Sequence, residues 1–465
     1  MSLPSTLMAA AGAALVCASA TAAPWGKSST GSHGEFGVEA SAPASTATER
    51  EPGSAGSSRG LVILCRKALL MPLVGQQILD NAAVFVENGK IARVVPRADV
   101  DVVALRETHE VMDRPDAWVS PGLIDLHSHV AGQSFFQNDL NDMVYLTNPG
   151  IRARTSVVPM NSDFLNGSAA GVTTVLYIPG SGTNIGGIGV LLKTGFANYE
   201  RMELRHPGSL KLAQAGNPER FLDGVGRMFM NWNTRNTFER GIAYAKRWIA
   251  YEESGGERPK VDPQWEVFRD LYNHTVQVSA HTQIYQVVLM TVKMVKEKLG
   301  LDVYIDHGSF DGWRAAEEAQ VLDVPAILGP RQVSVSINVE YRPGMFIVND
   351  NDGAIFGMAA KYQEAGHTMI GFNTDAPVIP QEALPLQAAM AVRYGFKNDN
   401  VDHMRGLTII PATASGVQAR VGSLQAGTDA DIIVTSGDPT DPRTTVFFTF
   451  QEGEKVYDSS VERRF

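Results

Sequence analysis

Residues 118–130 read WVSPGLIDLHSHV, and the rest of the chain is organised around this stretch. Pro121 and Gly122 interrupt what precedes them, and the apolar residues that follow predict a strand buried on both faces. The run ends at His127 and His129, which are two positions apart, so both imidazoles face the same side of the strand. Two neutral imidazoles directed at one point suit a divalent ion such as zinc. An isolated His-x-His is more often a pair of half-exposed histidines, so the metal interpretation needs ligands from elsewhere in the chain.

The composition indicates a globular protein with a sizeable core. The chain has 465 residues, of which 44% are hydrophobic and 19% charged, enough for one large domain and a smaller one. Its formal net charge is −10, and it has no basic stripe for binding phosphates, so nucleic acid is not an expected partner. Of the two cysteines, Cys17 lies in an N-terminal stretch that we expect to be removed, which would leave Cys65 without a disulfide partner.

The first 58 residues have the composition of an export signal followed by a linker. Residues 7–23 are apolar and rich in alanine, and they end in small residues, so residues 1–23 resemble a secretory signal peptide. Residues 24–58 are rich in Ser, Gly, Ala, Thr and Pro, which predicts a disordered linker. We therefore expect an exported protein, periplasmic or extracellular, or a cytoplasmic one if this segment is not a signal. No later run is long and uncharged enough to predict a transmembrane span in the mature chain.

The two ends of the ordered chain both predict short antiparallel strands. On the N-terminal side the strands are expected at 61–64, 82–87 and 90–95, with Asn88-Gly89 as a hairpin turn. On the C-terminal side they are expected at 431–435, 446–451 and 455–457. Residues 61–117 and 421–465 therefore predict one small β-sandwich built from both ends of the chain.

The middle of the chain, residues 118–420, alternates buried strands with helical patterns, which is typical of parallel βα units. Eight strands are expected, at 123–126, 172–178, 189–193, 210–213, 276–281, 303–307, 326–328 and 369–374. Helical patterns between them include 237–252, 284–299 and 312–321. These features predict an α/β fold with a (β/α)8 TIM barrel, whose active site lies at the carboxyl ends of the strands.

Three later strands of this barrel also run into polar residues. His281, His307 and Asp375 each follow an apolar run, and any one of them alone is more often a satisfied polar residue at a loop edge. Together with His127 and His129 they bring four imidazoles and one carboxylate to one mouth. That set is enough for one complete metal site with an open water position, and nearly enough for two ions.

Motifs at both ends of this region are similar to those of the amidohydrolase superfamily. Residues 121–129, PGLIDLHSH, resemble its opening motif, and residues 414–434, which include VGSL and GTDAD, resemble its closing one. Residues 212–220 and 373–380 look most like the imidazolonepropionase-related branch, which includes dipeptidases acting on N-acyl and Xaa-amino-acid substrates. The resemblance extends over residues 61–457 and implies metal-dependent hydrolysis of a carbon–nitrogen bond.

The resemblance also implies the metal ligands. His127, His129 and Asp375 resemble the ligands of the more buried metal, and His281 and His307 resemble those of a second metal. The expected cofactor is therefore a divalent metal, with zinc as our choice, and the number of ions, one or two, stays open.

A lysine on the fourth strand adds a further expectation. In two-metal members of the superfamily, a lysine carboxylated by CO₂ bridges the ions, and Lys211 is the matching position. A lysine buried among apolar neighbours has a depressed pKa and becomes a usable nucleophile. A lysine snorkelling from a strand edge is the alternative, and Lys193 is a competing candidate. Gly216 stands where relatives often carry Glu, so a one-metal site also remains open.

These residues together imply an enzyme that uses a metal-activated water to hydrolyse an amide, a cyclic amide, a dipeptide or an N-acyl amino acid. Asp375 would take the proton from water and pass it to the leaving amine, with His281 or His307 assisting at the tetrahedral oxyanion. The partner would be a small-molecule substrate, and a homo-oligomer stays open. The alternative is a catalytically inactive relative that serves as a binding or scaffold protein of the cell envelope. The retained metal-ligand side chains argue against that alternative.

Overall fold

The computed structural model describes residues 59–132, 145–214, 217–221, 225–335 and 355–465. The expected signal peptide, the expected linker and Gly216 lie outside the described residues. The chain divides into residues 1–57 and 58–465, and everything below concerns the second unit. Among the helices that the structure describes, none combines the length and the apolar character that a membrane span requires.

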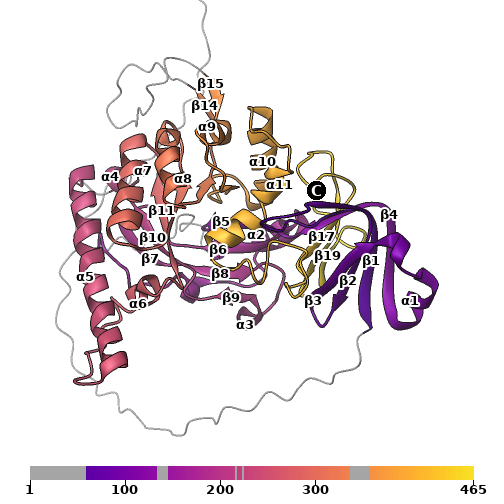
Figure 1. Cartoon of the computed structure of the whole chain (residues 1–465), viewed down its shortest axis with the longest axis horizontal. Helices are drawn as coiled ribbons and strands as arrows, with labels where there is room; N and C mark the ends of the chain where they lie inside the picture. Colours follow the sequence, from indigo (N-terminus) through magenta and orange to yellow (C-terminus); the bar gives the residue numbers. More distant parts are fainter. Residues whose placement is uncertain (1–58, 133–144, 215–216, 222–224, 336–354) are drawn as a thin grey trace, which may run out of the picture. The chain divides into compact units, whose positions relative to one another are not determined.

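The two ends of this unit meet in one seven-stranded sheet, here called the terminal sheet. Its strands are β1 (Gly60–Leu69), β2 (Ile78–Glu87), β3 (Lys90–Pro96), β4 (His109–Pro121), β17 (Ile432–Thr435), β18 (Val446–Gln451) and β19 (Glu454–Asp458). The strand order is β19-β18-β17-β4-β1-β2-β3 (Figure 1). β4 joins the two halves because it runs parallel to β1 and antiparallel to β17. Strands from residues 60–121 and from residues 432–458 therefore share one sheet, while the small β-sandwich built from both ends stays a prediction.

The tight turns of the terminal sheet follow directly from the sequence. Asn88 and Gly89 have φ of 51° and 75°, and they join β2 to β3 as an antiparallel hairpin. Glu452 and Gly453 have φ of 48° and 75° between β18 and β19. Two successive residues with positive φ are typical of the hairpin turns whose twist matches the strands, which confirms the predicted hairpin at Asn88-Gly89.

The middle of the chain forms two more sheets of buried strands. Their orders are β16-β13-β12-β11-β10-β7 and β5-β6-β8-β9. The bounds are β5 (Leu123–Ser128), β6 (Val172–Tyr177), β7 (Ile185–Ile188), β8 (Val190–Lys193), β9 (Glu203–Arg205), β10 (Ser209–Ala213), β11 (Gln277–Thr282), β12 (Val303–His307), β13 (Ala326–Leu328) and β16 (Ile370–Phe372). β14 (Val333–Val335) and β15 (Ile355–Gly357) form a separate two-stranded sheet.

Helices alternate with most of these strands, so the fold is mixed α/β. They are α1 (Val102–Thr108), α2 (Ser162–Ala169), α3 (Tyr199–Met202), α4 (Asn217–Phe221), α5 (Arg227–Ser254), α6 (Val267–Tyr272), α7 (Tyr285–Thr291), α8 (Ala316–Val321), α9 (Met358–Glu364), α10 (Leu384–Arg393), α11 (Asp402–Arg405) and α12 (Ile409–Ala414). In Figure 1 the long α5 and the terminal sheet lie on opposite sides of the central strands. The three predicted helices are present, two of them extended by a π-helical or a 3-10 turn.

The direction of the predicted third strand is a correction to the sequence analysis. β10, β11, β12, β13 and β16 run parallel, and so do β5 and β6. However, β7 runs antiparallel to β10, and β8 runs antiparallel to β6. Parallel neighbours need a crossover of about a dozen residues or more. Between β6 and its neighbour β8 lie only residues 178–189, which contain β7 and no helix, so no crossover is available and the chain returns antiparallel. The expected run of eight parallel βα units is therefore wrong at this position.

The reversed strand carries Lys193 away from the carboxyl ends of its neighbours and toward the terminal sheet. Its Nζ lies 2.7 Å from Asp429 Oδ2 and 2.9 Å from Asp431 Oδ1, both of which are buried. The carboxylate of Glu452 lies 3.1 Å away. Burial acts to lower the pKa of Lys193, but the carboxylates of Asp431 and Asp429 raise it above its ordinary value. Lys193 is therefore a charged ion-pair partner that ties β8 to the start of β17 and to the turn after β18.

Replacing Lys193 by alanine is expected to lower the free energy of unfolding by about 3–5 kcal/mol, because it leaves buried carboxylates uncompensated. Lys90 contacts the same Asp429, but its side chain is 46% exposed. Lys90→Ala is the matched control and is expected to cost about 1 kcal/mol or less. Urea denaturation of both variants measures the difference, and equal losses would contradict the assignment of Lys193 as the buried member of this network.

Candidate metal centre

Three of the predicted ligands meet at the end of β5. His127 Nε2 lies 3.0 Å from His129 Nε2, and Asp375 Oδ1 lies 3.2 Å from the first nitrogen and 3.3 Å from the second. Both histidines are buried, and the Asp375 side chain is largely so. Two imidazole nitrogens and a carboxylate oxygen that face one another at this range form a donor set that suits a divalent cation.

The outer nitrogens of these two histidines are already held by the protein. His129 Nδ1 donates to the carbonyl oxygen of Ile178 over 2.8 Å, and His127 Nδ1 is hydrogen-bonded to the carboxylate of Asp306. Metal-binding histidines almost always have their second nitrogen engaged in this way, which fixes the tautomer and the orientation of the ring. In both rings, Nε2 is therefore the nitrogen that faces the other donors.

His281 and His307 repeat the same arrangement beside the first pair. His281 Nδ1 lies 2.7 Å from Ser181 Oγ, and His307 Nδ1 lies 2.8 Å from the carbonyl oxygen of Gly329. Nε2 of each ring is buried and has no hydrogen-bond partner among the residues that the structure describes. Buried polar atoms are rarely left unpaired, so two unpaired nitrogens in one place indicate a missing ligand.

The rings are close enough to act as one site. The ring centroids of His281 and His307 are 4.3 Å apart, and those of His307 and His127 are 4.6 Å apart. Burial lowers the pKa of His281 well below its ordinary value and lowers that of His307 to about 4. These two imidazoles are therefore neutral at pH 7, which is the form that binds a metal.

The carboxylates act on the remaining groups of the site. Burial acts to lower the pKa of His127, but the carboxylate of Asp306 raises it to about 9. Burial acts to raise the pKa of Asp375, but the charges of His307 and His127 hold it well below its usual range. The carboxylate of Asp306 therefore favours the charged form of His127, and the neighbouring imidazoles favour the ionised form of Asp375.

Lys211 on β10 also reaches the cluster. Its side chain is fully buried, and its Nζ lies 3.1 Å from His127 Nε2 and 4.0 Å from Asp306 Oδ2. Lys193, the competing candidate, pairs instead with the carboxylates beside the terminal sheet. All six predicted site residues are thus brought together (His127, His129, Lys211, His281, His307 and Asp375), and the roles assigned to them stay proposals.

Two of the six residues adopt a backbone conformation that is rare outside glycine. His307 has φ of 74° and Asp375 has φ of 51°, both in the left-handed region. In a regular strand, successive side chains point to opposite faces, yet Asp306 and His307 both have donor atoms within reach of His127. The turn of the chain at His307 explains how two neighbouring residues both face the site.

Asp306 is the residue of the site that the sequence analysis did not assign. Its carboxylate also accepts hydrogen bonds from Ser279 Oγ over 2.7 Å and from Asn373 Nδ2 over 3.2 Å. The available signal was a single carboxylate inside the apolar strand that ends at His307. Because charged side chains are almost never fully buried unless they are paired, that position predicts a buried polar partner.

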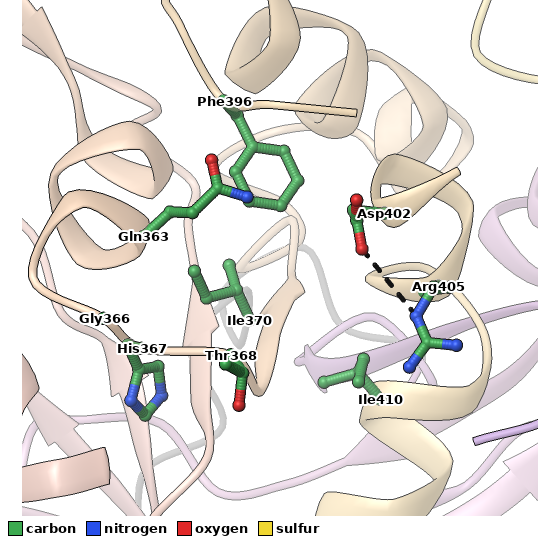
Figure 2. Close-up of a pocket in the computed structure, with 9 residues that line it drawn as sticks. All are labelled: Gln363, Gly366, His367, Thr368, Ile370, Phe396, Asp402, Arg405 and Ile410. Carbon is green, nitrogen blue, oxygen red and sulfur yellow. Dashed lines mark ion pairs between the residues drawn. The ribbon is translucent and has the colours of Figure 1, made fainter. Parts of the chain in front are cut away.

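The cavity in Figure 2 lies elsewhere in the molecule. It encloses about 200 Å³, and its lining includes Ile370, His367, Phe396 and Arg405 but none of the six site residues. Ile370 begins β16, whereas Asp375 follows its other end. The cavity is therefore at the amino end of that strand, and the metal centre is at the carboxyl end.

Curated relatives agree with the motifs in the sequence. The chain matches no protein-family model. It is 26% identical over 423 residues to amidohydrolase tasK of Hapsidospora irregularis, which covers 81% of this chain and 40% of tasK. It is 21% identical over 405 residues to imidazolonepropionase of Thermoplasma volcanium, which covers 83% of this chain and 92% of that enzyme. The chain thus spans less than half the length of tasK.

Solved structures agree with the same family. An amidohydrolase from Thermotoga maritima MSB8 aligns over 86% of this chain and 100% of its own, with a TM-score of 0.72 and 25% identity. A putative prolidase from Bifidobacterium longum aligns over 86% of this chain and 95% of its own, with a TM-score of 0.50 and 18% identity, which is a likeness of fold. The curated relatives and the Thermotoga maritima structure therefore support the amidohydrolase superfamily, and the similarity to imidazolonepropionase supports that branch within it.

Proposed function

We propose that the protein is a metal-dependent hydrolase that cleaves a carbon–nitrogen bond in a small molecule: an amide, a cyclic amide, a dipeptide or an N-acyl amino acid. The observation that carries the proposal is a cluster of four buried imidazoles, each held by Nδ1. Nε2 of His127 and of His129 faces Asp375, and the rings of His307 and His281 adjoin that pair. The names of the relatives, amidohydrolase and imidazolonepropionase, support a carbon–nitrogen bond as the target.

We further propose which residues hold the metal. His127, His129 and Asp375 would hold one divalent ion, and His281 and His307 a second, with Lys211 as a carboxylated bridge. Zinc suits this set because imidazole nitrogen and carboxylate oxygen are its common ligands. When bound, a divalent ion supplies a Lewis acid and lowers the pKa of water to about 7.

The chain's own groups would then move the proton and stabilise charge. Asp375, as a carboxylate, accepts a proton from the attacking water and returns it to the leaving amine. His281 or His307 would assist at the tetrahedral oxyanion through the cation that it holds, because a neutral imidazole whose Nδ1 carries the proton has no second N–H to donate. Asp306 keeps His127 in one tautomer and orientation throughout.

The finer architecture is also part of this proposal. We propose that the two central sheets are parts of one barrel of eight strand positions, in which β7 and β8 together occupy the third. An isolated parallel bridge between Ser128 and Ala376 supports contact between the first and last positions. In a barrel of this kind the site would lie at the carboxyl ends of the parallel strands.

The test is metal analysis together with a panel of N-acyl amino acids, dipeptides and an imidazolone. We expect bound zinc, hydrolysis of at least one class, loss of turnover after chelation and its return with added zinc. Full activity of the chelated, metal-free protein would contradict metal dependence. A zinc-loaded protein that binds but hydrolyses none of them would favour the alternative, an inactive binding or scaffold protein, which the retained side chains do not favour.

Replacing Asp375 by asparagine is expected to keep the fold and part of the metal, and to lower kcat by about 100- to 10,000-fold. An amide cannot accept the proton of the attacking water, and proton transfer by a positioned side chain contributes on that order. Steady-state kinetics on metal-quantified protein measure the effect. Near-normal turnover by Asp375→Asn would overturn this mechanism.

His127→Ala is expected to lose metal as well as activity, because it removes a central Nε2 donor. His403→Ala is the matched control, since His403 is equally buried but pairs with Asp438, away from the site. Inductively coupled plasma mass spectrometry of both proteins after dialysis measures the bound metal. Equal metal retention in the two variants would remove His127 from the ligand set.

If Lys211 is carboxylated, protein loaded with ¹³C-bicarbonate shows a carbamate carbon signal by NMR. Lys211→Ala then loses that signal and one bound ion, and short carboxylates such as propionate partly restore its activity. Lys193→Ala is the control and keeps the signal, because Lys193 is held by Asp429 and Asp431. A metal-loaded wild-type protein without any carbamate signal would leave Lys211 as an unmodified buried lysine.

A further inference from the structure

We infer that Asp125 is a positioning residue that holds His127 and His129 in place against Asp375. It acts through a buried set of four side chains, Asp125, Ser128, Thr374 and Gln381, which we call the Asp125 clasp. Its consequence for catalysis rests on the proposed function, but its contacts are properties of the fold.

The clasp lies where the backbone alone does not join two neighbouring strands. Phe372 N donates to the carbonyl oxygen of Gly406 over 3.0 Å, and Ile124 N donates to that of Leu407 over 2.8 Å. A Cβ on Gly406 would lie 2.6 Å from the Phe372 ring, so the chain passes very close to β16 there. Residues 406–407 therefore connect β5 near its first residues with β16 at Phe372.

Beyond residues 406–407, toward the carboxyl end of β5, few backbone hydrogen bonds join β5 to the segment that follows β16. An isolated bridge pairs Ser128 with Ala376, and His129 N donates to the carbonyl oxygen of Ala376 over 2.9 Å. No longer ladder joins these two strands within the described ranges. The relative position of His127, His129 and Asp375 therefore depends on side chains to an unusual degree.

Asp125 supplies the missing link. Its Oδ1 accepts a hydrogen bond from His127 N over 3.1 Å, and both carboxylate oxygens lie 3.3 Å from Thr374 N. Its Oδ2 also accepts the hydroxyl of Thr374 and, over 2.7 Å, Nε2 of Gln381. One buried carboxylate thus holds the backbone two residues from its own position and the backbone immediately before Asp375.

Gln381 extends the clasp back to β5. Its Oε1 accepts a hydrogen bond from Ser128 Oγ over 2.7 Å, while its Nε2 donates to Asp125. The hydroxyl of Thr374 also accepts from Ala376 N over 3.1 Å. The clasp therefore encloses the two short segments, 125–129 and 374–376, that carry three of the proposed ligands.

A carboxylate is the group that this position requires. Asp125 is fully buried and faces only donors, and hydrogen bonds to an ionised acceptor are roughly twice as strong as neutral ones. Asparagine in its place would direct its own NH₂ at another donor and leave both unpaired. Since the contacts of Asp125 go to Thr374, Gln381 and the backbone rather than to donor atoms of the metal centre, its role is to position and not to react.

The matched control is Asp431→Asn, at the opposite end of β5. Asp431 is also buried, and its Oδ1 accepts from Lys193 Nζ and Glu452 N, each over 2.9 Å. Its backbone carbonyl accepts from Gly122 N, directly before β5. Both variants remove a buried carboxylate, but only Asp125→Asn touches the segments that carry the ligands.

The experiment compares full-length wild type, Asp125→Asn and Asp431→Asn by amide hydrogen exchange and by the rate at which zinc is lost to a chelator. In the metal-free protein, we expect Asp125→Asn to speed exchange at 124–130 and 372–378 beyond its change in global stability. Zinc is expected to leave about 10- to 100-fold faster, the range for loss of a residue that orients ligands. Asp431→Asn should change exchange there only in proportion to global stability.

Equal behaviour of Asp125→Asn and Asp431→Asn in both measurements would overturn the inference. If Asp125→Asn does not fold, Thr374→Val and Thr374→Ser decide, because only serine keeps the hydroxyl of the clasp. Identical exchange and zinc loss in those two variants would likewise contradict it. If the wild type binds no zinc, the proposed function fails, while the exchange data still test the clasp.

Discussion

The site depends on one repeated constraint: each of four buried imidazoles is fixed through Nδ1. The partners differ, being a carboxylate, a hydroxyl and two backbone carbonyls, but the result is the same, with Nε2 directed inward. Because the rings cannot turn without losing these bonds, the four imidazoles stay close together in a buried cluster. That arrangement is unfavourable without a ligand and favourable with a cation, which is why it carries the functional proposal.

The reversal of β7 and β8 gives the two buried lysines different tasks. Lys193 ends a strand that runs against its neighbours, so it leaves the central strands at the end where Asp429 and Asp431 lie. Lys211 lies on β10, which runs with β11, and its amine reaches His127. Because β8 runs antiparallel to β6 while β10 runs parallel to β11, Lys193 lies at the terminal sheet and Lys211 at the metal centre, although both are fully buried.

Buried carboxylates are used at both ends of β5. Where the strand begins, the backbone carbonyl of Asp431 accepts a hydrogen bond from Gly122 N, and its carboxylate accepts one from the Lys193 amine. Asp125 and Asp306 hold the other end, through the backbone and through the ring of His127. Each carboxylate is paired or fully hydrogen-bonded, as a buried charge must be, and together they fix the position of the strand that carries the first two ligands.

The sequence by itself determined which short segments are strands and which polar residues end them. Apolar runs bounded by turn residues indicate buried strands, and the predicted strands 303–307 and 326–328 match β12 and β13 in full. The predicted turn at Asn88-Gly89 is also present. Polar residues at the ends of such runs also predicted one shared site formed by His127, His129, His281, His307 and Asp375. It missed β4 as a long strand, because its first half alternates weakly and is largely exposed.

Tertiary structure alone decided strand direction and pairing between distant residues. An apolar run has the same composition whichever way the strand runs, so the direction of β8 is seen only in its antiparallel pairing with β6. Asp306 meets His127 across 179 residues, and Asp125 meets Thr374 across 249. No local periodicity encodes such contacts. The sequence indicates that a buried carboxylate needs a partner, but only the folded structure identifies which distant residue it is.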